Sequence, residues 1–296
     1  MKSPVFSGAC TALVTPFHGN GSIHYEALAA LIEAQIIGGV SALCVCGTTG
    51  EASTLSYEER RKLVAFCVEQ VKHRVKVIAG AGSNNTAAAL RLSQQAQEAG
   101  ADGLLLVTPY YNKTTQAGLI RHYEFIADRV SLPILLYNVP SRTGLSFTAE
   151  TYHTLAQHPN INGVKEASGN FSLLSHTLAL CPPDFYVWSG NDDQVVPMMA
   201  LGAKGVISVA GNLSPELMVK LCRLCLEGNF PEAAQLQLRC TDLFDALFCE
   251  VNPIPVKAAM NLLGREAGGL RLPLCDISAE NRAVLRSALE RVGLLT

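Results

Sequence analysis

The sequence has little charge and few aromatic residues, and these shortages exclude several classes of protein. Charged residues make up 16% of the 296 positions and aromatic residues 6%. The 23 basic side chains nearly balance the 25 acidic ones, so no basic excess indicates binding to nucleic acid or to a membrane surface. No apolar run reaches the roughly 18 residues of a membrane-spanning helix, and the N-terminus MKSPVFSGACTALVTP lacks the apolar core of a signal peptide. We therefore expect a compact cytoplasmic protein.

Patterns that bind metal ions are also missing. The seven histidines form no HxH or HExxH pattern. Cys222 and Cys225 have the spacing of half a zinc site, but no second pair accompanies them, so a zinc or redox site is the weaker alternative. The ten cysteines are spread through apolar segments such as ALCVC (42–46), where cysteine packs as a small hydrophobe, and free thiols in this number are typical of a reducing cytoplasm. We expect no metal and no cofactor.

The sequence does contain a regular alternation of two kinds of segment. Short runs rich in Val, Ile and Leu alternate with longer segments of helical period. Because the apolar runs are continuous, they predict strands of a parallel sheet that is covered by helices. Eight such runs occur, at residues 8–16, 41–47, 75–82, 103–109, 133–140, 161–167, 185–192 and 203–212. The helical segments between them lie at residues 25–37, 57–73, 86–99, 116–129, 148–157, 171–180 and 194–201.

Eight successive strand–helix units predict an α/β fold of the (β/α)8 type, the TIM barrel, with an open doubly wound sheet as the alternative. Barrels of this length form one domain, and no linker rich in Pro, Gly or Ser divides the chain. Further helical segments follow at residues 215–227, 231–248, 255–263 and 280–292. We expect a catalytic barrel over residues 1–213 and a C-terminal helical domain over residues 214–296.

Polar residues follow several of the predicted strands. In TIM barrels the active site lies at the carboxyl ends of the strands. Here the second strand ends in GTTGE (47–51), the fourth in TPYYN (108–112), the fifth in YNVPSRTG (137–144) and the sixth in Lys165-Glu166. Hydroxyls, phenols, one arginine and one lysine therefore converge, without a cysteine, a histidine or a cluster of carboxylates.

Lys165 is the most informative of these residues. A lysine at the end of a buried strand has to reach water, find a partner or stay neutral, and a neutral amine adds to a ketone to give an electron-withdrawing iminium. Tyr137, passing protons through Thr48 and Tyr111, offers the acid and base that this chemistry needs. Arg142 offers two donors to a substrate carboxylate. Each residue alone has an ordinary structural explanation, but the combination at consecutive strand ends favours catalysis.

A glycine-containing stretch near residue 80 gives a weaker signal. Gly80, Gly82 and the following Asn84-Asn85-Thr86 are similar to a phosphate-binding loop. The third glycine of such a loop is missing, so we interpret the stretch as a turn followed by a helix cap.

Six motifs resemble those of the dihydrodipicolinate synthase family. They are GTTGE (47–51), TPYYN (108–112), YNVPSRTG (137–144), GVKEASGN (163–170), GVISV (205–209) and NPIPVK (252–257), in order over nearly the whole chain. The resemblance implies a (β/α)8 lyase of the class I aldolase type with a C-terminal helical domain. It implies condensation of pyruvate with aspartate 4-semialdehyde to 4-hydroxy-tetrahydrodipicolinate, in lysine and diaminopimelate synthesis. A homodimer or homotetramer without a cofactor is expected.

The resemblance assigns the catalytic roles. Lys165 is expected to form the Schiff base with pyruvate. The proton relay is expected to consist of Thr48, Tyr111 and Tyr137. In this family the tyrosine that matches Tyr111 reaches into the site of the neighbouring subunit, so the working unit is at least a dimer.

The resemblance also implies how the substrates are held. Thr49 is expected to hold the pyruvate carboxylate, and Arg142 the carboxylate of the semialdehyde. Gly190 and the backbone of Ile207 are expected to line the pocket. The family often has aspartate where this chain has Asn191, so the resemblance does not imply the detailed contacts to the second substrate at this position.

A possible allosteric site follows from the same resemblance. In lysine-inhibited members the end product binds in a cleft at a dimer interface. The matching positions are Ser53, Tyr57, Arg60, Asn84, Ala88 and Tyr110. The sensitive pattern has histidine at the position of Tyr57 and glutamate at that of Ala88, where the glutamate pairs with an ammonium group of lysine. Since Ala88 has no carboxylate, we expect weak inhibition by lysine or none.

Two other functions remain open at this point. A sibling Schiff-base aldolase, such as N-acetylneuraminate lyase or a keto-deoxy sugar acid aldolase, shares the lysine and the tyrosine but usually lacks an arginine at the position of Arg142. A catalytically silent barrel acting as a binding protein is the alternative of another class, which the intact set of Lys165, Tyr137 and Thr48 disfavours.

Overall fold

The computed structural model describes residues 1–295 and confirms the predicted barrel. Its strands pair in parallel in sequence order, and β8 pairs with β1, so the sheet closes and the open doubly wound alternative is excluded. The strands are β1 (Gly8–Ala12), β2 (Ala42–Val45), β3 (Lys76–Gly80), β4 (Gly103–Val107), β5 (Ile134–Asn138), β6 (Ile161–Glu166), β7 (Tyr186–Ser189) and β8 (Gly205–Ser208). Each lies within its predicted apolar run.

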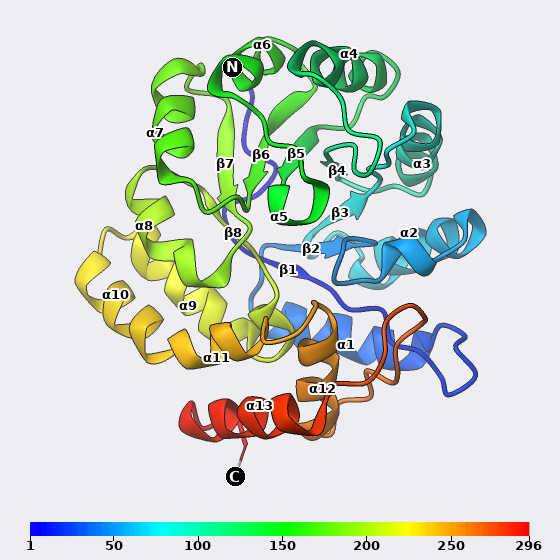
Figure 1. Cartoon of the computed structure of the whole chain (residues 1–296), viewed down its shortest axis with the longest axis vertical. Helices are drawn as coiled ribbons and strands as arrows, with labels where there is room; N and C mark the ends of the chain where they lie inside the picture. Colours follow the sequence, from blue (N-terminus) through cyan, green and yellow to red (C-terminus); the bar gives the residue numbers. More distant parts are fainter. Residues whose placement is uncertain (296) are drawn as a thin grey trace.

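Helices surround the strands on the outside (Figure 1). The α-helices up to the last barrel strand are α1 (Tyr25–Ile37), α2 (Tyr57–Val71), α3 (Thr86–Glu98), α4 (Gln116–Ala127), α5 (Pro140–Thr143), α6 (Ala149–Ala156), α7 (Phe171–Leu180) and α8 (Val195–Ala200). Those after it are α9 (Pro215–Leu226), α10 (Phe230–Arg239), α11 (Thr241–Ala246), α12 (Ile254–Leu262) and α13 (Ala279–Arg291). Short 3-10 turns occur at η1 (Ala52–Thr54), η2 (Asp192–Gln194) and η3 (Ala210–Asn212).

The strands are mainly apolar because nearly all of their residues are buried on one face of the sheet or the other. Successive side chains of a strand point to opposite faces. In β4, Leu104 and Leu106 pack with the core under the helices, whereas Leu105 packs with Cys10, Ile78 and other side chains in a separate cluster inside the barrel. Every residue of β1, β2, β5 and β6 is buried. The polar residues at the barrel mouth lie at the last positions of the strands, such as Lys165 and Glu166 of β6, or in the segments that follow them.

Local capping signals set the starts of two barrel helices. Ser56 and Glu59 form a reciprocal capping box at the start of α2. Asn85 caps α3 by accepting hydrogen bonds from the backbone N–H groups of Ala87 and Ala88. The interpretation of the stretch near residue 80 as a turn followed by a helix cap is thus confirmed. Gly80 is needed there for another reason: a Cβ at this position would lie 2.1 Å from the backbone oxygen of Cys46.

The C-terminal helices differ from the prediction in one place. We expected a single helix over residues 231–248, and this is wrong, because α10 and α11 are separate helices that bend at Cys240. α10 packs against α8 and α9, whereas α11 packs against α13 and η2, so the bend directs the two apolar faces to different partners. α9 contacts both β8 and β1. The division into domains at residues 213 and 214 stays a prediction.

The cysteines behave largely as the composition indicated. Seven of the ten are buried, including Cys222 and Cys225 on α9, and Cys275 is the exposed exception. Burial raises the pKa of Cys44 to about 11 and that of Cys46 to about 12, so both thiols stay protonated and poorly nucleophilic at neutral pH. Within residues 1–295, no helix combines the length and the apolar composition that crossing a membrane requires.

A buried ion pair joins the C-terminal helices to the barrel. The Lys257 ammonium on α12 donates to Glu51 Oε1 at 2.8 Å and to the backbone oxygens of Thr15 at 3.0 Å and Gly269 at 2.5 Å. The other oxygen of Glu51 accepts the backbone N–H of Arg271 at 3.0 Å. Both charged side chains are almost completely buried, at 1% and 0% exposure. α12 is therefore fixed to the GTTGE segment that follows β2.

Breaking this pair is expected to destabilise the protein strongly. Lys257→Met leaves the Glu51 carboxylate buried without its cation, which costs about 3 to 5 kcal/mol of the free energy of unfolding. The matched control is Lys76→Met, which breaks an ion pair with Asp102 whose lysine side chain is 53% exposed, and it should cost less than about 1 kcal/mol. Denaturant unfolding of the two variants measures the difference. Equal losses would show that the buried pair contributes no more than a surface pair.

Candidate active site

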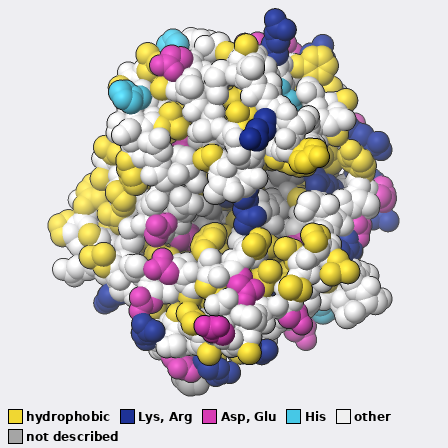
Figure 2. Space-filling model, viewed as in Figure 1, with side chains coloured by type: hydrophobic (Ala, Val, Ile, Leu, Met, Phe, Trp, Pro, Cys, Tyr) yellow, Lys and Arg dark blue, Asp and Glu magenta, His cyan; other side chains and the backbone are white. Residues whose placement is uncertain are grey.

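Two adjoining cavities open where the strands end. The larger has a volume of about 560 Å³ and is lined by residues that include Lys165 and Thr49, and the smaller has a volume of about 180 Å³. Both are lined by Thr48, Tyr137, Val139 and Arg142, so they share one wall. The space-filling view shows a hollow near the centre of this face with basic side chains beside it (Figure 2). The structure therefore brings together most of the side chains that the strand ends predicted.

Lys165 lies inside the barrel mouth and has no acidic partner. It is 6% exposed, and its position on β6 is opposite Tyr137 of β5 and Trp188 of β7. Its Nζ lies 4.5 Å from the centroid of the Tyr137 ring, over the ring face. Lys257, the other buried lysine, is bound to a carboxylate and two backbone oxygens, whereas Lys165 takes part in none of the ion pairs within residues 1–295. The amine of Lys165 thus faces the cavity as a potential nucleophile.

Gly190, after β7, makes room for the Lys165 side chain. A Cβ at position 190 would lie 3.0 Å from Lys165 Cε and 2.6 Å from the Cβ of Ala167. The distance to Ala167 is too short for two carbon atoms and that to Lys165 is tight, so a larger residue would displace the segment after β6 and press on the end of the lysine side chain. Gly190 also lines the larger cavity, as the resemblance implied.

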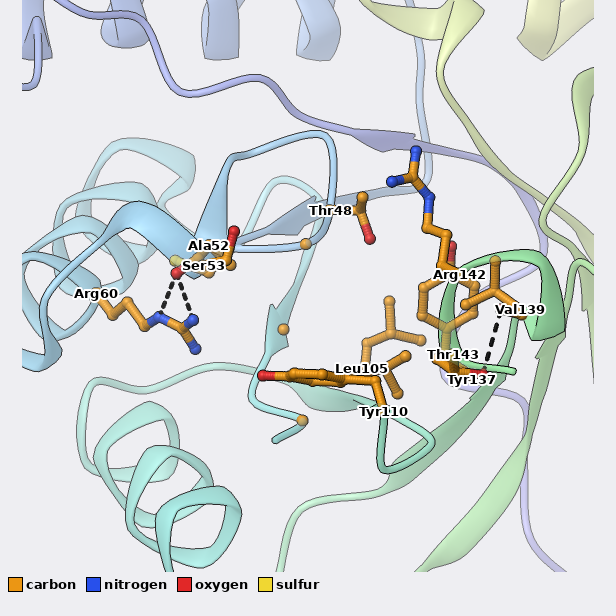
Figure 3. Close-up of a pocket in the computed structure, with 15 residues that line it drawn as sticks. Thr48, Ala52, Ser53, Arg60, Leu105, Tyr110, Tyr137, Val139, Arg142 and Thr143 are labelled. Carbon is orange, nitrogen blue, oxygen red and sulfur yellow. Dashed lines mark hydrogen bonds between the residues drawn. The ribbon is translucent and has the colours of Figure 1, made fainter. Parts of the chain in front are cut away.

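Tyr137 and Thr48 lie between the two cavities. Tyr137 is 8% exposed, so most of its ring is packed in the barrel interior. Thr48 is half-buried and follows β2. In Figure 3, Ser53 and Arg60 lie on one side of the smaller cavity and Tyr137 and Arg142 on the other, with Thr48 between them. The two hydroxyl-bearing side chains thus line the space beside the lysine.

A short helix that the sequence analysis did not predict carries Arg142. α5 begins at Pro140 and ends at Thr143, and the next residue, Gly144, adopts a left-handed conformation with φ 64°. Proline at the start and glycine after the end are signals of a helix, so this element was readable from the sequence. Arg142 Nη2 donates to the backbone oxygen of Asn252 at 3.1 Å, which holds the exposed guanidinium at the cavity wall.

Thr49 is connected to the same asparagine. Its hydroxyl accepts a hydrogen bond from Asn252 Nδ2 at 3.0 Å, and both side chains are buried. Asn252 belongs to the segment 248–252, which lines the larger cavity although it follows the barrel in sequence. Sequence reasoning noted the motif that begins with Asn252 but gave the residue no role.

Tyr111 does not reach the cavities of its own chain. Its side chain is 93% exposed, and it lines neither cavity. It adopts a left-handed backbone conformation with φ 67°, as does Lys113 with φ 46°. Such conformations are uncommon for bulky residues and often mark functional segments. The segment after β4 is thus turned outward, and Asn112 fixes it by donating to the backbone oxygen of Asn84 at 3.0 Å.

Two buried carboxylates support the ends of β6, β7 and β8. Glu166 accepts hydrogen bonds from Asn138, from the Tyr152 hydroxyl and from the backbone N–H of Ser168. Asp192 Oδ2 accepts the backbone N–H groups of Val209 at 3.0 Å and Ala210 at 2.9 Å. Burial raises the pKa of Asp192, and these hydrogen bonds and the charge of Lys165 oppose the rise. Both carboxylates hold loops next to Lys165, and sequence reasoning assigned no role to either.

The remaining predicted substrate-site residues lie at different depths. Asn191 lines the larger cavity, with its Nδ2 3.3 Å from Gln194 Oε1. Ile207 is fully buried in the barrel interior and does not line either cavity, whereas Val209, two residues later, lines the larger one.

The six positions of the possible allosteric site divide into two groups. Ser53, Arg60 and Tyr110 line the smaller cavity, where the Arg60 guanidinium donates to the backbone oxygen of Ala52. The other three, Tyr57, Asn84 and Ala88, do not line it. The guanidinium of Arg91 lies over the Tyr57 ring, with its Cζ 4.5 Å from the centroid of the ring.

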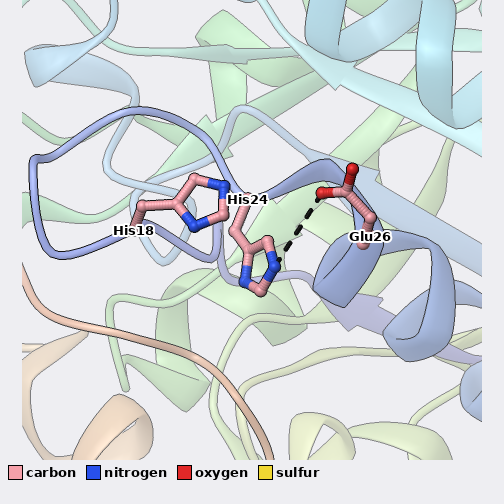
Figure 4. A group of neighbouring side chains, drawn as sticks. All are labelled: His18, His24 and Glu26. Carbon is pink, nitrogen blue, oxygen red and sulfur yellow. Dashed lines mark ion pairs between the residues drawn. The ribbon is translucent and has the colours of Figure 1, made fainter.

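One group of side chains has the composition of a metal site. His18, His24 and Glu26 have potential ligand atoms that all lie within 4.8 Å of one another (Figure 4). His24 Nε2 lies 3.8 Å from Glu26 Oε2, and the Glu26 side chain is 84% exposed. None of the three lines either cavity.

Comparison with known proteins gives consistent results. Residues 5–292 match the Dihydrodipicolinate synthetase family. The chain is 50% identical to the 4-hydroxy-tetrahydrodipicolinate synthase of Acetivibrio thermocellus over 295 residues, which cover 100% of each protein. The solved structure of DHDPS from Cyanidioschyzon merolae with lysine bound is 41% identical, with a TM-score of 0.96 over 99% of this chain and 100% of that one. The solved structure of the chloride-inhibited dihydrodipicolinate synthase of Acinetobacter baumannii, complexed with pyruvate, is 40% identical. The TM-score is 0.96, and the match covers 98% of this chain and 99% of that one.

Proposed function

The chain belongs to the dihydrodipicolinate synthetase family, and we propose that it acts as a 4-hydroxy-tetrahydrodipicolinate synthase. The reaction joins pyruvate to aspartate 4-semialdehyde through a Schiff base on Lys165. The observation that carries this proposal is the buried amine of Lys165, which faces a cavity without an acidic partner while the other buried lysine is fully bound. The relative from Acinetobacter baumannii, which is complexed with pyruvate, supports pyruvate as the first substrate.

The first half of the reaction uses Lys165 as a nucleophile. Its neutral amine adds to the ketone carbon of pyruvate, and loss of water from the carbinolamine leaves an iminium. The iminium withdraws electrons, so a proton leaves the methyl carbon and an enamine forms. The Lys165 amine lies over the face of the Tyr137 ring, 4.5 Å from its centroid, and Lys165 lines the larger cavity in which pyruvate would bind.

The second half forms the new carbon–carbon bond. The enamine carbon attacks the aldehyde carbon of the semialdehyde, and the aldehyde oxygen takes up a proton. The amino group of the semialdehyde then attacks the iminium carbon and displaces Lys165, which closes the ring and regenerates the free amine. Tyr137 and Thr48 line the cavity beside Lys165 and are the groups that we assign to these proton transfers.

Two residues at the cavity wall are suited to the substrate carboxylates. Thr49 presents a hydroxyl in the larger cavity and is assigned to the carboxylate of pyruvate. Arg142 lies at the wall that the two cavities share and is assigned to the carboxylate of the semialdehyde. An arginine here favours a second substrate that carries a carboxylate over the polyhydroxylated chains of the sibling aldolases.

The exposed position of Tyr111 is the reason for proposing an oligomer. A bulky residue in a strained left-handed conformation that faces solvent is suited to entering the site of a neighbouring copy. We therefore assign Tyr111 to the proton relay of a partner subunit, in a homodimer or homotetramer. The ten free cysteines are the basis for assigning the protein to the reducing cytoplasm.

Inhibition by lysine is expected to be weak or absent. The relative from Cyanidioschyzon merolae binds lysine, and the positions that match the lysine site of sensitive members include Ala88 and Arg60. Ala88 offers no carboxylate to an ammonium group. The Arg60 and Arg91 guanidinium groups near this region add like charge, which opposes binding of a cation.

Trapping with borohydride tests the proposed function directly. Incubation with pyruvate and reduction should attach one pyruvyl group to Lys165, visible by peptide mass spectrometry. Lys165→Arg should abolish this adduct because the guanidinium keeps the charge but is not a nucleophile.

The role of Arg142 is tested by the same trapping reaction. Arg142→Ala should trap pyruvate as wild type does and lose affinity for the semialdehyde. An adduct on another lysine, or none, contradicts the proposal for Lys165, and loss of trapping in Arg142→Ala contradicts the role of the arginine.

Co-expression of two inactive variants tests the role of Tyr111. Tyr111→Phe should lower kcat by about 10² to 10⁴, as should Tyr137→Phe, because each removes a proton-transferring hydroxyl. In a mixed dimer of Tyr111→Phe and Lys165→Ala, one of the two sites has both residues intact. Random pairing then restores about one quarter of the wild-type sites. Activity no higher than the sum of the two variants assayed separately would place Tyr111 in its own subunit's site.

A lysine titration at saturating pyruvate tests the regulatory proposal. A lost charge-assisted hydrogen bond of roughly 1.5 to 3 kcal/mol weakens binding by about 10- to 150-fold. The lysine concentration that half-inhibits the enzyme is therefore expected to lie above the millimolar range. Ala88→Glu should lower this concentration. Half-inhibition of the unmodified enzyme at micromolar lysine would show that Ala88 does not determine sensitivity.

A further inference from the structure

Asn252 contacts both residues that the proposed function assigns to substrate carboxylates. Its side-chain Nδ2 lies 3.0 Å from Thr49 Oγ1, and its backbone oxygen accepts Arg142 Nη2 at 3.1 Å. The residue is 5% exposed and stands just before α12, in the segment that closes the larger cavity. No other residue in the described chain bonds to both Thr49 and Arg142 side chains.

The direction of the Thr49 hydrogen bond has a chemical consequence. A threonine hydroxyl has one proton to donate and two lone pairs that accept. Since one lone pair accepts the Asn252 amide, the proton remains available for an acceptor in the cavity. Within residues 1–295, Asn252 Oδ1 is buried and has no hydrogen-bond partner, so the contact of this side chain with Thr49 is the one made by Nδ2. The amide thus favours Thr49 as a donor, which is what a carboxylate requires.

The backbone around this contact is fixed at a second point. Lys257, on the first turns of α12, holds Glu51, two residues after Thr49. The segments 49–51 and 252–257 are therefore joined by two buried contacts, one neutral and one ionic. This double attachment limits the freedom of Asn252 to turn away from Thr49.

We propose that Asn252 is a positioning residue that directs the Thr49 hydroxyl as a donor to the carboxylate of pyruvate. This inference rests on the proposed function, because it takes pyruvate as the ligand of the larger cavity. Asn252 acts through Thr49 and does not touch the reacting atoms. Through its backbone oxygen it also keeps Arg142 at the adjoining wall, so one residue sets the distance between the two carboxylate sites.

The test compares a substitution of nearly equal shape with one that removes the side chain. Asn252→Asp replaces the amide by a carboxylate, which only accepts hydrogen bonds. The Thr49 hydroxyl would then donate its hydrogen bond to this carboxylate and not to the substrate, and the carboxylate would add negative charge beside the substrate. The pyruvate concentration that half-saturates borohydride trapping on Lys165 should rise by about 10- to 150-fold. Asn252→Ala removes the amide and frees the hydroxyl to turn, and the rise should be only about 2- to 10-fold. A packing role predicts the reverse order, because alanine leaves a cavity and aspartate does not.

Two controls complete the experiment. Asn191→Asp adds a negative charge to the same cavity without contact to Thr49, and it should raise the half-saturating concentration less than Asn252→Asp does. In a Thr49→Val background, which lacks the hydroxyl, Asn252→Ala should have no further effect.

The outcomes separate this inference from the function on which it rests. The inference is overturned if Asn252→Asp binds pyruvate as tightly as wild type, or if Asn252→Ala raises the half-saturating pyruvate concentration more than Asn252→Asp does. It is also overturned if Asn191→Asp raises this concentration as much as Asn252→Asp does, or if the effects of Asn252→Ala and Thr49→Val add. Wild-type protein that traps no pyruvate on Lys165 overturns both the function and the inference. Trapping by wild type with the wrong order among the variants overturns the inference alone.

Discussion

Closure of a parallel sheet is the constraint on which the rest of this structure depends. Pairing of β8 with β1 leaves no open edge, and parallel pairing turns the carboxyl ends of all eight strands to one rim. The segments that follow β2, β5, β6 and β7 are distant in sequence but meet there. The apolar strands beneath them are buried on both faces, so the polar side chains that follow the strands are held by a rigid base.

The two buried lysines show how the surroundings of one residue type decide its role. Lys257 contacts a carboxylate and two backbone oxygens, so its charge is neutralised and its contribution is to hold α12 on the barrel. Burial lowers the pKa of Lys257, and the Glu51 carboxylate opposes that effect. Lys165 has an aromatic ring face and a cavity in place of these partners. An amine without a fixed partner is free to form a covalent bond to a substrate, and this difference is the physical basis for assigning the chemistry to Lys165.

The site is completed by residues outside the eight strand–helix units. The segment 248–252 lines the larger cavity, and Asn252 bonds to Thr49 and to Arg142. α12 is held in place by the Glu51 pair, so the stability of the C-terminal helices and the shape of the substrate cavity depend on the same contacts. Tyr111 shows a complementary dependence, because its outward orientation leaves the proposed relay incomplete within one chain.

The sequence by itself determined the eight strands and most of the helices, because each of these elements depends on residues that are close together along the chain. Continuous apolar runs gave the eight strands, Asn85 gave a helix cap, and the strand ends gave Lys165, Tyr137 and Thr48 as neighbours. The bend at Cys240 was missed because it depends on which partners α10 and α11 pack against. Only the tertiary structure identified Asn252 as a partner of Thr49, since the two are separated by 203 positions. Only the tertiary structure showed that Lys257 pairs with a buried carboxylate whereas Lys165 faces the cavity without one. Such contacts depend on how the barrel closes and how α12 docks on it, and neither is encoded in the spacing of neighbouring residues.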